Sequence, residues 1–231
     1  MIHALHGNSG LPDDLLPLLH ATGRSFRAWH LWQWLAEHQD AASFDGIAAA
    51  LREAADESPR MLIGYSLGAR LALHALTQQP GAWDAAILIS AHPGLRNETE
   101  RAARLAHDEA WAARFRRDPW PEVMRDWNEQ PVLAGGAVPP HSAESWRREV
   151  AQGFEVWSLG RQEDLRPLLP RVSCPVLWLT GERDAKFTAL AAECCALLPN
   201  AEHVIVPGAG HRVHVDRPDA ACAWLKARPH C

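Results

Sequence analysis

Six short runs of mostly apolar residues alternate along the chain with longer stretches of mixed polar and apolar positions. Apolar residues occupy successive positions in these runs, a pattern typical of strands that are covered on both faces. Residues 68–78, which follow the third run, are predicted to be helical. We therefore predict a parallel sheet whose strands are joined by crossover helices. The predicted strands are residues 1–5, 25–31, 60–65, 85–90, 175–180 and 203–207.

Residues 95–170 interrupt this alternation. The segment has no convincing strand pattern, is rich in arginine, and contains five of the 11 tryptophans of the chain. We interpret it as a helical lid inserted between two strands. The sheet-forming core would then comprise residues 1–94 and 171–231.

Composition narrows the class of protein. The chain has 231 residues, of which 47% are hydrophobic, and a net charge of −5, so it suits one globular domain and not a general nucleic-acid or anionic-membrane binder. The apolar runs are too short to span a bilayer, and the first residues do not resemble a signal peptide. Five cysteines without a CxxC pair indicate free thiols. We expect a cytoplasmic protein without a metal or other cofactor; its oligomeric state is left open.

The sequence Gly-Tyr-Ser-Leu-Gly at residues 64–68 lies between a predicted strand and a predicted helix. A sharp strand-to-helix turn of this kind presents the hydroxyl of Ser66 above the end of the sheet, as in a nucleophile elbow. The alternative is an ordinary turn in which the serine caps the helix.

An activated serine needs an imidazole to take its proton and an acid to orient that imidazole. Asp184 and His211 each follow a later predicted strand, in the order Ser, Asp, His. Glu182 is an alternative acid and His214 an alternative base. The backbone N–H groups of Leu67 and Asn8 are the expected oxyanion-hole donors, with Gly7 allowing close approach of the backbone.

These motifs resemble those of the α/β-hydrolase superfamily. Within it, the segments at 63–70, 92–95, 126–127, 130–132, 181–187 and 208–211 are similar to the synthases of menaquinone biosynthesis that form 2-succinyl-6-hydroxy-2,4-cyclohexadiene-1-carboxylate. The resemblance implies a sheet that lacks the first two strands of the family. Its six remaining parallel strands would lie in the family order 4-3-5-6-7-8, which is second, first, third, fourth, fifth and sixth in this chain.

The same resemblance implies a lyase in which the Ser–His pair removes a proton and pyruvate is expelled, without an acyl-enzyme or a metal. A serine carboxylesterase or carbon–carbon bond hydrolase with Ser66 as covalent nucleophile is the alternative, and a noncatalytic binding module of this fold is a third reading. A substrate of the synthases bears several carboxylates, which predicts arginines in the site.

Two arginines are candidates for binding these carboxylates. Arg70 lies one helical turn after Ser66, and Arg104 shares a helical face with Trp111 and Phe115. Both match arginines of the family pattern, and Trp127 matches an aromatic residue of its lid, although a core role for Trp127 is the alternative. Tyr65, next to Ser66, is a further candidate substrate-binding residue. We therefore expect a small carboxylated molecule as the substrate.

Overall fold

Six parallel strands form one sheet in the order β2-β1-β3-β4-β5-β6 in the computed structural model, which describes residues 1–55 and 59–227. This confirms the predicted fold, including the strand order, and the described residues add no antiparallel strand to the sheet. The strands are β1 (Ile2–Leu5), β2 (Phe26–Trp29), β3 (Met61–Tyr65), β4 (Ala85–Ile89), β5 (Val176–Gly181) and β6 (Ala201–Val206).

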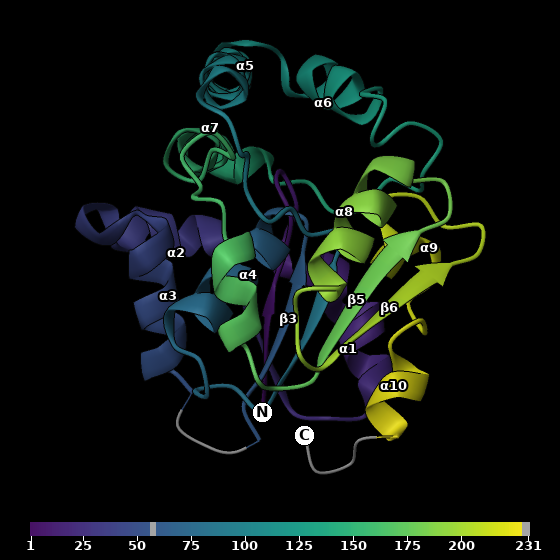
Figure 1. The fold of residues 1–231 in the computed structure, drawn as a ribbon. Helices are drawn as coiled ribbons and strands as arrows, with labels where there is room; N and C mark the ends of the chain where they lie inside the picture. Colours follow the sequence, from purple (N-terminus) through teal and green to yellow (C-terminus); the bar gives the residue numbers. More distant parts are fainter. Residues whose placement is uncertain (56–58, 228–231) are drawn as a thin grey trace.

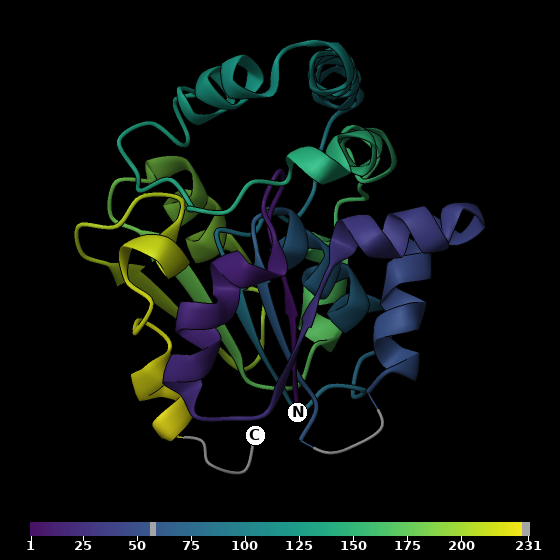
Figure 2. The same ribbon diagram turned by 180° about the vertical axis from the view of Figure 1, so that it is seen from behind.

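Ten α-helices and four short 3₁₀ turns occur in the described part of the chain. The helices are α1 (Leu16–Thr22), α2 (Leu31–Glu37), α3 (Phe44–Glu53), α4 (Leu67–Gln78), α5 (Glu98–Arg117), α6 (Trp120–Asn128), α7 (Arg147–Val156), α8 (Ala185–Cys195), α9 (Val213–Asp216) and α10 (Cys222–Lys226). The 3₁₀ turns are Pro12–Leu15, Gln39–Ala41, Glu144–Trp146 and Arg166–Arg171. Helices cover both faces of the sheet (Figures 1 and 2).

Alternate residues of each central strand pack into two different cores. In β5, Leu177 faces the core that contains residues of α1 and α10, whereas Trp178 faces the core that contains residues of α3, α4 and α8. Both side chains are fully buried. Burial on both faces explains why the strands read as continuous apolar runs and not as alternating ones.

The predicted strand ends differ from the observed ends by at most two residues. The largest shift at a strand start is at β6, which begins at Ala201, two residues before the expected start. Its first residues pair with β5 from Val176 onward, although they include a glutamate and a histidine. Backbone pairing extends the strand here beyond its apolar part, because an edge strand exposes one side to water.

Helices α5, α6 and α7 lie above the carboxyl ends of the strands (Figure 1). All of residues 95–170 are described, and none of them is in a strand. A cluster of aromatic rings joins the three helices, with Phe115 stacked on Phe154 at 5.2 Å between centroids and Trp127 edge-on to Phe154 at 5.1 Å. Trp111, Trp120 and Trp127 belong to this cluster and therefore serve packing. The division of the chain into a core and a lid stays a prediction.

The chain order changes direction at β1, which pairs with β2 on one side and with β3 on the other. In open parallel sheets, ligands bind at such a switch point, beyond the carboxyl ends of the strands. The loop after β1 carries Gly7 and Asn8, and the turn after β3 carries Ser66. The topology thus brings the predicted oxyanion-hole loop next to the predicted nucleophile.

Candidate active site

Ser66 occupies a strained turn between β3 and α4. Its backbone has φ 51° and ψ −107°, and its N–H donates to the Ile89 carbonyl at 2.9 Å. The turn depends on close backbone approaches, because a Cβ on Gly64 would lie 2.4 Å from the Gly68 carbonyl oxygen. A Cβ on Gly68 would lie 2.1 Å from the Leu5 carbonyl oxygen. The two glycines of the motif are therefore required by the packing of α4 against β3 and β1.

Three non-glycine residues have positive φ in the described chain: Ser9, Ser66 and Ser90. Ser9 and Ser66 line the larger of two adjoining cavities, and Ser66 and Ser90 line the smaller one. Backbone strain of this kind persists only where surrounding structure holds it, and it is concentrated at functional sites. The Ser90 hydroxyl also donates to the His211 carbonyl at 2.9 Å, which fixes the histidine loop.

Ser66, His211 and Asp184 form one hydrogen-bonded chain. His211 Nε2 lies 3.1 Å from Ser66 Oγ, and His211 Nδ1 lies 2.6 Å from Asp184 Oδ2. Because the carboxylate accepts the Nδ1 proton, Nε2 is left free to accept the proton of the serine hydroxyl. Asp184 and His211 are both buried, which strengthens these bonds.

The alternative acid and base have other positions. Glu182 is exposed and accepts from the Gly208 N–H at 2.9 Å. His214 is buried against Tyr65, with the ring centroids 4.1 Å apart. The structure thus brings Asp184 and His211, and not Glu182 and His214, into hydrogen-bond contact with each other and with Ser66.

Leu67 and Asn8 both lie at the serine. Leu67 is the first residue of α4, where a backbone N–H has no acceptor within its own helix. Asn8 lines both cavities together with Ser66. Its side-chain oxygen is buried without a hydrogen-bond partner among the described residues, so a ligand hydroxyl could satisfy it.

The larger cavity has a volume of about 1040 Å³ including its open mouth, and the smaller one about 310 Å³. Ser66, Asn8, His92 and Arg104 border both, so the cavities meet at the serine.

Arg70 and Arg104 both reach this region. Arg70 is buried in the smaller cavity and donates to the Gln162 side-chain oxygen at 3.1 Å and to the Trp157 carbonyl at 2.8 Å. Burial, together with repulsion from Arg104, lowers the pKa of Arg70 to about 9, which leaves it protonated at neutral pH. Arg104 pairs with the buried Asp108 at 2.8 Å. Arg70 has no carboxylate partner among the described residues, so its positive charge is available to an anionic ligand.

Trp127 and Tyr65 both line the larger cavity. Trp127 also packs edge-on against Trp111 at 5.1 Å between centroids, so it combines a core contact with a cavity wall. Burial raises the pKa of Tyr65, which is therefore a neutral phenol at ordinary pH.

Several other residues of the cavity wall have no role predicted from the sequence. His92 accepts a hydrogen bond from the Gly94 N–H at its Nδ1, at 3.1 Å, so the ring proton is on Nε2. Burial and nearby cations, Lys186 first, lower the pKa of His92 to about 2. His92 is thus a neutral hydrogen-bond donor beside Ser66. Its position in the loop that follows β4 was the available signal, since the ends of neighbouring parallel strands share one edge.

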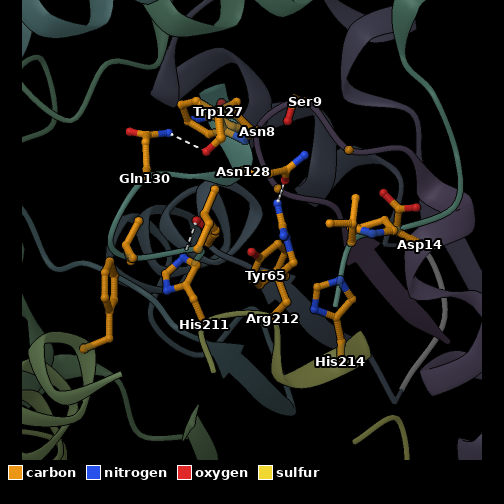
Figure 3. Close-up of a pocket in the computed structure, with 18 of the residues that line it drawn as sticks. Asn8, Ser9, Asp14, Tyr65, Trp127, Asn128, Gln130, His211, Arg212 and His214 are labelled. Atoms are coloured by element: carbon orange, nitrogen blue, oxygen red, sulfur yellow. Dashed lines mark hydrogen bonds between the residues drawn. The ribbon is translucent and has the colours of Figure 1, made fainter. Parts of the chain in front are cut away.

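Arg212 and Asn128 also line the larger cavity, and Figure 3 shows them joined by a hydrogen bond. Asn128 ends α6 and Arg212 directly follows His211. Nothing in the sequence pairs these two residues, because the contact depends on how the helical segment lies over the sheet.

Buried histidines make stability depend on pH. His6 and His214 are buried, and burial lowers the pKa of each from 6.5 to about 3. Between pH 6.5 and 3 the unfolded chain binds more protons at these two histidines than the folded chain does. Their contribution to the free energy of unfolding is therefore fully present above pH 6.5 and is lost as the pH decreases. Each buried histidine should lower the free energy of unfolding by roughly 1 kcal/mol for each pH unit below 6.5 in this window. Urea unfolding at pH 7.5 and 5.5 should show the loss.

The substitution His214→Gln provides the check. It removes one buried titratable ring, so the free energy of unfolding of this variant should change less between the two pH values than that of the wild type. An equal or larger change would contradict the assignment of His214 as a buried neutral histidine.

The described chain contains no helix long and apolar enough to cross a membrane. Cys194, Cys195 and Cys222 form no disulfide among the described residues. Cys231 lies outside the described residues.

Comparison with known proteins identifies the class. The sequence model of the alpha/beta hydrolase family matches residues 6–224, and the chain belongs to this family. Within it, the chain is 36% identical over 236 aligned positions to 2-succinyl-6-hydroxy-2,4-cyclohexadiene-1-carboxylate synthase from Klebsiella pneumoniae strain 342, covering 96% of this chain and 90% of that protein. The synthase of the same name from Serratia proteamaculans is 40% identical over 172 residues, covering 71% of this chain and 66% of that protein.

A solved structure gives a similar result at the level of the fold. MenH from S. aureus superimposes with a TM-score of 0.84 and 21% identity, covering 98% of this chain and 91% of that chain. The chain is thus a member of the 2-succinyl-6-hydroxy-2,4-cyclohexadiene-1-carboxylate synthase family, and the predicted resemblance is confirmed.

Proposed function

We propose that this protein forms 2-succinyl-6-hydroxy-2,4-cyclohexadiene-1-carboxylate by eliminating pyruvate from a carboxylated precursor in menaquinone biosynthesis. The observation that carries the proposal is a hydrogen-bonded Ser66–His211 pair that shares its cavity region with the unpaired, buried cation Arg70. The activity is that of the relatives named above. We further propose that the protein acts in the cytoplasm.

The reaction begins with removal of the proton next to the succinyl ketone. Ser66 Oγ takes this proton while His211 Nε2 takes the hydroxyl proton of Ser66, so the positive charge collects on His211. The carboxylate of Asp184, 2.6 Å from Nδ1, stabilises the imidazolium that forms. The serine acts as a base in this step and forms no covalent bond to the substrate.

The electron pair left by the proton develops negative charge on the ketone oxygen. The N–H groups of Leu67 and Asn8 are our candidates to bind this oxygen, and hydrogen bonds aimed at a developing charge supply a large part of such catalysis. Collapse of the enolate then breaks the carbon–oxygen bond to the three-carbon group. That group leaves as enolpyruvate and takes up a proton to become pyruvate.

Arg70 and Arg104 hold carboxylates of the substrate during these steps. Arg70 supplies a desolvated positive charge beside the serine, which favours an anionic group strongly because little water competes there. The remaining walls, including Trp127 and Tyr65, contact the ring and its apolar parts.

The proposal is tested by following pyruvate release from the enolpyruvyl precursor with a lactate dehydrogenase assay. We expect turnover by the purified protein and a strongly reduced rate after Ser66→Ala. Turnover of simple aryl esters without pyruvate release would reject the synthase reading. It would instead favour the carboxylesterase or carbon–carbon bond hydrolase alternative.

Arg70→Gln should raise the KM for the carboxylated precursor about 10- to 100-fold, because the variant loses a charge-assisted hydrogen bond in a desolvated site. Hydrolysis of a small neutral aryl ester, if detectable, should change little. Arg70 is a cleaner target than Arg104, whose removal would leave the buried Asp108 without its cation. Steady-state kinetics on both substrates measure the effect.

Arg147→Gln is the matched control. Arg147 also donates to two backbone carbonyls, those of Phe115 and Asp118, but does not line either cavity. Its KM for the precursor should stay within a few-fold of the wild type. Equal losses on the precursor and the neutral ester in Arg70→Gln would argue against a carboxylate-binding role.

A further inference from the structure

A second buried arginine, Arg212, lines the cavity region at a different place from Arg70. Only 5% of its surface is exposed, and it lies between His211 and the start of α9. Arg212 lines the larger cavity and Arg70 the smaller one, while Ser66 borders both. The two arginines thus approach the serine from two adjoining cavities.

All hydrogen-bond partners of Arg212 among the described residues are neutral. Its guanidinium donates to the Ala137 carbonyl at 3.3 Å and to the Asn128 side-chain oxygen. The hydroxyl of Tyr65 is a further neutral neighbour. Figure 3 shows Arg212 between Asn128 and Tyr65 in the cavity. A guanidinium has five N–H donors, so these contacts leave donors for a ligand.

The nearby carboxylates are engaged elsewhere. Asp184 holds His211, and Asp216 accepts from the Gly210 N–H at 2.8 Å and pairs with Arg183 at 3.6 Å. Asp14, across the cavity, accepts from His141 at 3.0 Å. None of them forms an ion pair with Arg212 among the described residues. A buried cation without an anion is costly, and a bound anion would offset that cost.

We propose that Arg212 binds a second carboxylate of the substrate, distinct from the one that Arg70 holds. This inference rests on the proposed function, since the product named for the relatives has two carboxylates, one on the ring and one at the end of the succinyl chain. Arg212 and Arg70 match these two separated carboxylates, and each can bind its carboxylate with paired N–H donors. Arg104 remains the candidate for the carboxylate of the enolpyruvyl group, which the precursor carries in addition. The site therefore selects a dicarboxylate over either monocarboxylate.

Binding of three aromatic analogues tests the inference without requiring turnover. The first is 2-succinylbenzoate, which carries both carboxylates. The second, 4-oxo-4-phenylbutanoate, lacks the ring carboxylate, and the third, 2-butanoylbenzoate, lacks the chain carboxylate. Isothermal calorimetry gives Kd for each with the wild type, Arg212→Gln and Arg70→Gln.

We expect Arg212→Gln to weaken 2-succinylbenzoate about 10- to 100-fold. Arg212→Gln should also weaken the binding of one monocarboxylate and leave the Kd of the other unchanged. Arg70→Gln should affect the other monocarboxylate instead. Arg212→Lys, which keeps the charge, should recover part of the loss. Arg183→Gln is the control. Arg183 donates to the Gly135 carbonyl at 2.9 Å, two residues before the Ala137 carbonyl that Arg212 contacts, but it does not line the larger cavity.

Equal weakening of all three analogues by Arg212→Gln, or no weakening of any, would overturn the inference, as would failure of the wild type to bind 2-succinylbenzoate. The proposed function fails separately. Arginine-dependent binding without pyruvate release would retain the dicarboxylate site and reject the synthase reaction. Pyruvate release by the wild type, with an unchanged Kd for 2-succinylbenzoate in Arg212→Gln, would retain the synthase reaction and reject the role of Arg212.

Discussion

Replacing Ser66 with alanine should lower the rate of pyruvate release at least about 10³-fold, because the variant lacks the oxygen that takes the substrate proton. The hydroxyl is held 3.1 Å from His211 Nε2, and no other described hydroxyl is hydrogen-bonded to that nitrogen. The coupled pyruvate assay measures the loss as kcat. Circular dichroism should show an unchanged fold, since the substitution removes one half-buried oxygen.

The double variant Ser66→Ala/His211→Asn distinguishes a joint role from two separate ones. Residues that act as one catalytic unit have strongly non-additive effects, so the double variant should be no more than a few-fold slower than either single variant. Losses that multiply would indicate that Ser66 and His211 act on different steps. Retention of more than about a tenth of the activity by Ser66→Ala would identify another base.

Replacing Gly68 with alanine should destabilise the fold by about 3 kcal/mol or prevent folding, because overpacking against rigid atoms costs this much or more. The added methyl would lie 2.1 Å from the Leu5 carbonyl oxygen and 2.6 Å from that of His6. Both are backbone atoms of β1 and its loop, which cannot move without disturbing the centre of the sheet. Urea unfolding measures the difference in free energy.

Gly136→Ala is the control for this effect. A methyl at Gly136 would have its nearest neighbour, the Leu133 carbonyl oxygen, at 3.4 Å, which is an ordinary contact. The free energy of unfolding of this variant should lie within about 0.5 kcal/mol of the wild type. A Gly68→Ala variant as stable as Gly136→Ala would contradict the close packing of α4 against β1.

The fold and the Ser66–His211–Asp184 arrangement were predictable because each depends on order along the chain. Buried parallel strands have a distinctive apolar pattern, and their carboxyl ends meet at one edge of the sheet. Residues that directly follow such strands therefore come together whatever the details of packing. The two glycines of the motif added a second signal, since each marks a close backbone approach.

The pairing and the protonation of other residues in the site gave no such signal. Arg212 and Asn128 are 84 positions apart and meet only because α6 lies over the histidine loop. His92 is a neutral donor only because the Gly94 N–H selects its tautomer and because burial, together with neighbouring cations, lowers the pKa of its ring. Pairing and protonation depend on distances between elements, which periodicity along a chain does not contain.

The sequence alone thus determined the parallel sheet, its six strands and the serine, acid and base that follow three of them, because local pattern and strand order specify these features. Only the tertiary structure decided which arginines are buried without a carboxylate partner. Arg70 and Arg212 are buried in this way, whereas Arg104 pairs with Asp108. The charge that an arginine offers to a ligand depends on desolvation and on competing partners, and both are properties of the packed molecule.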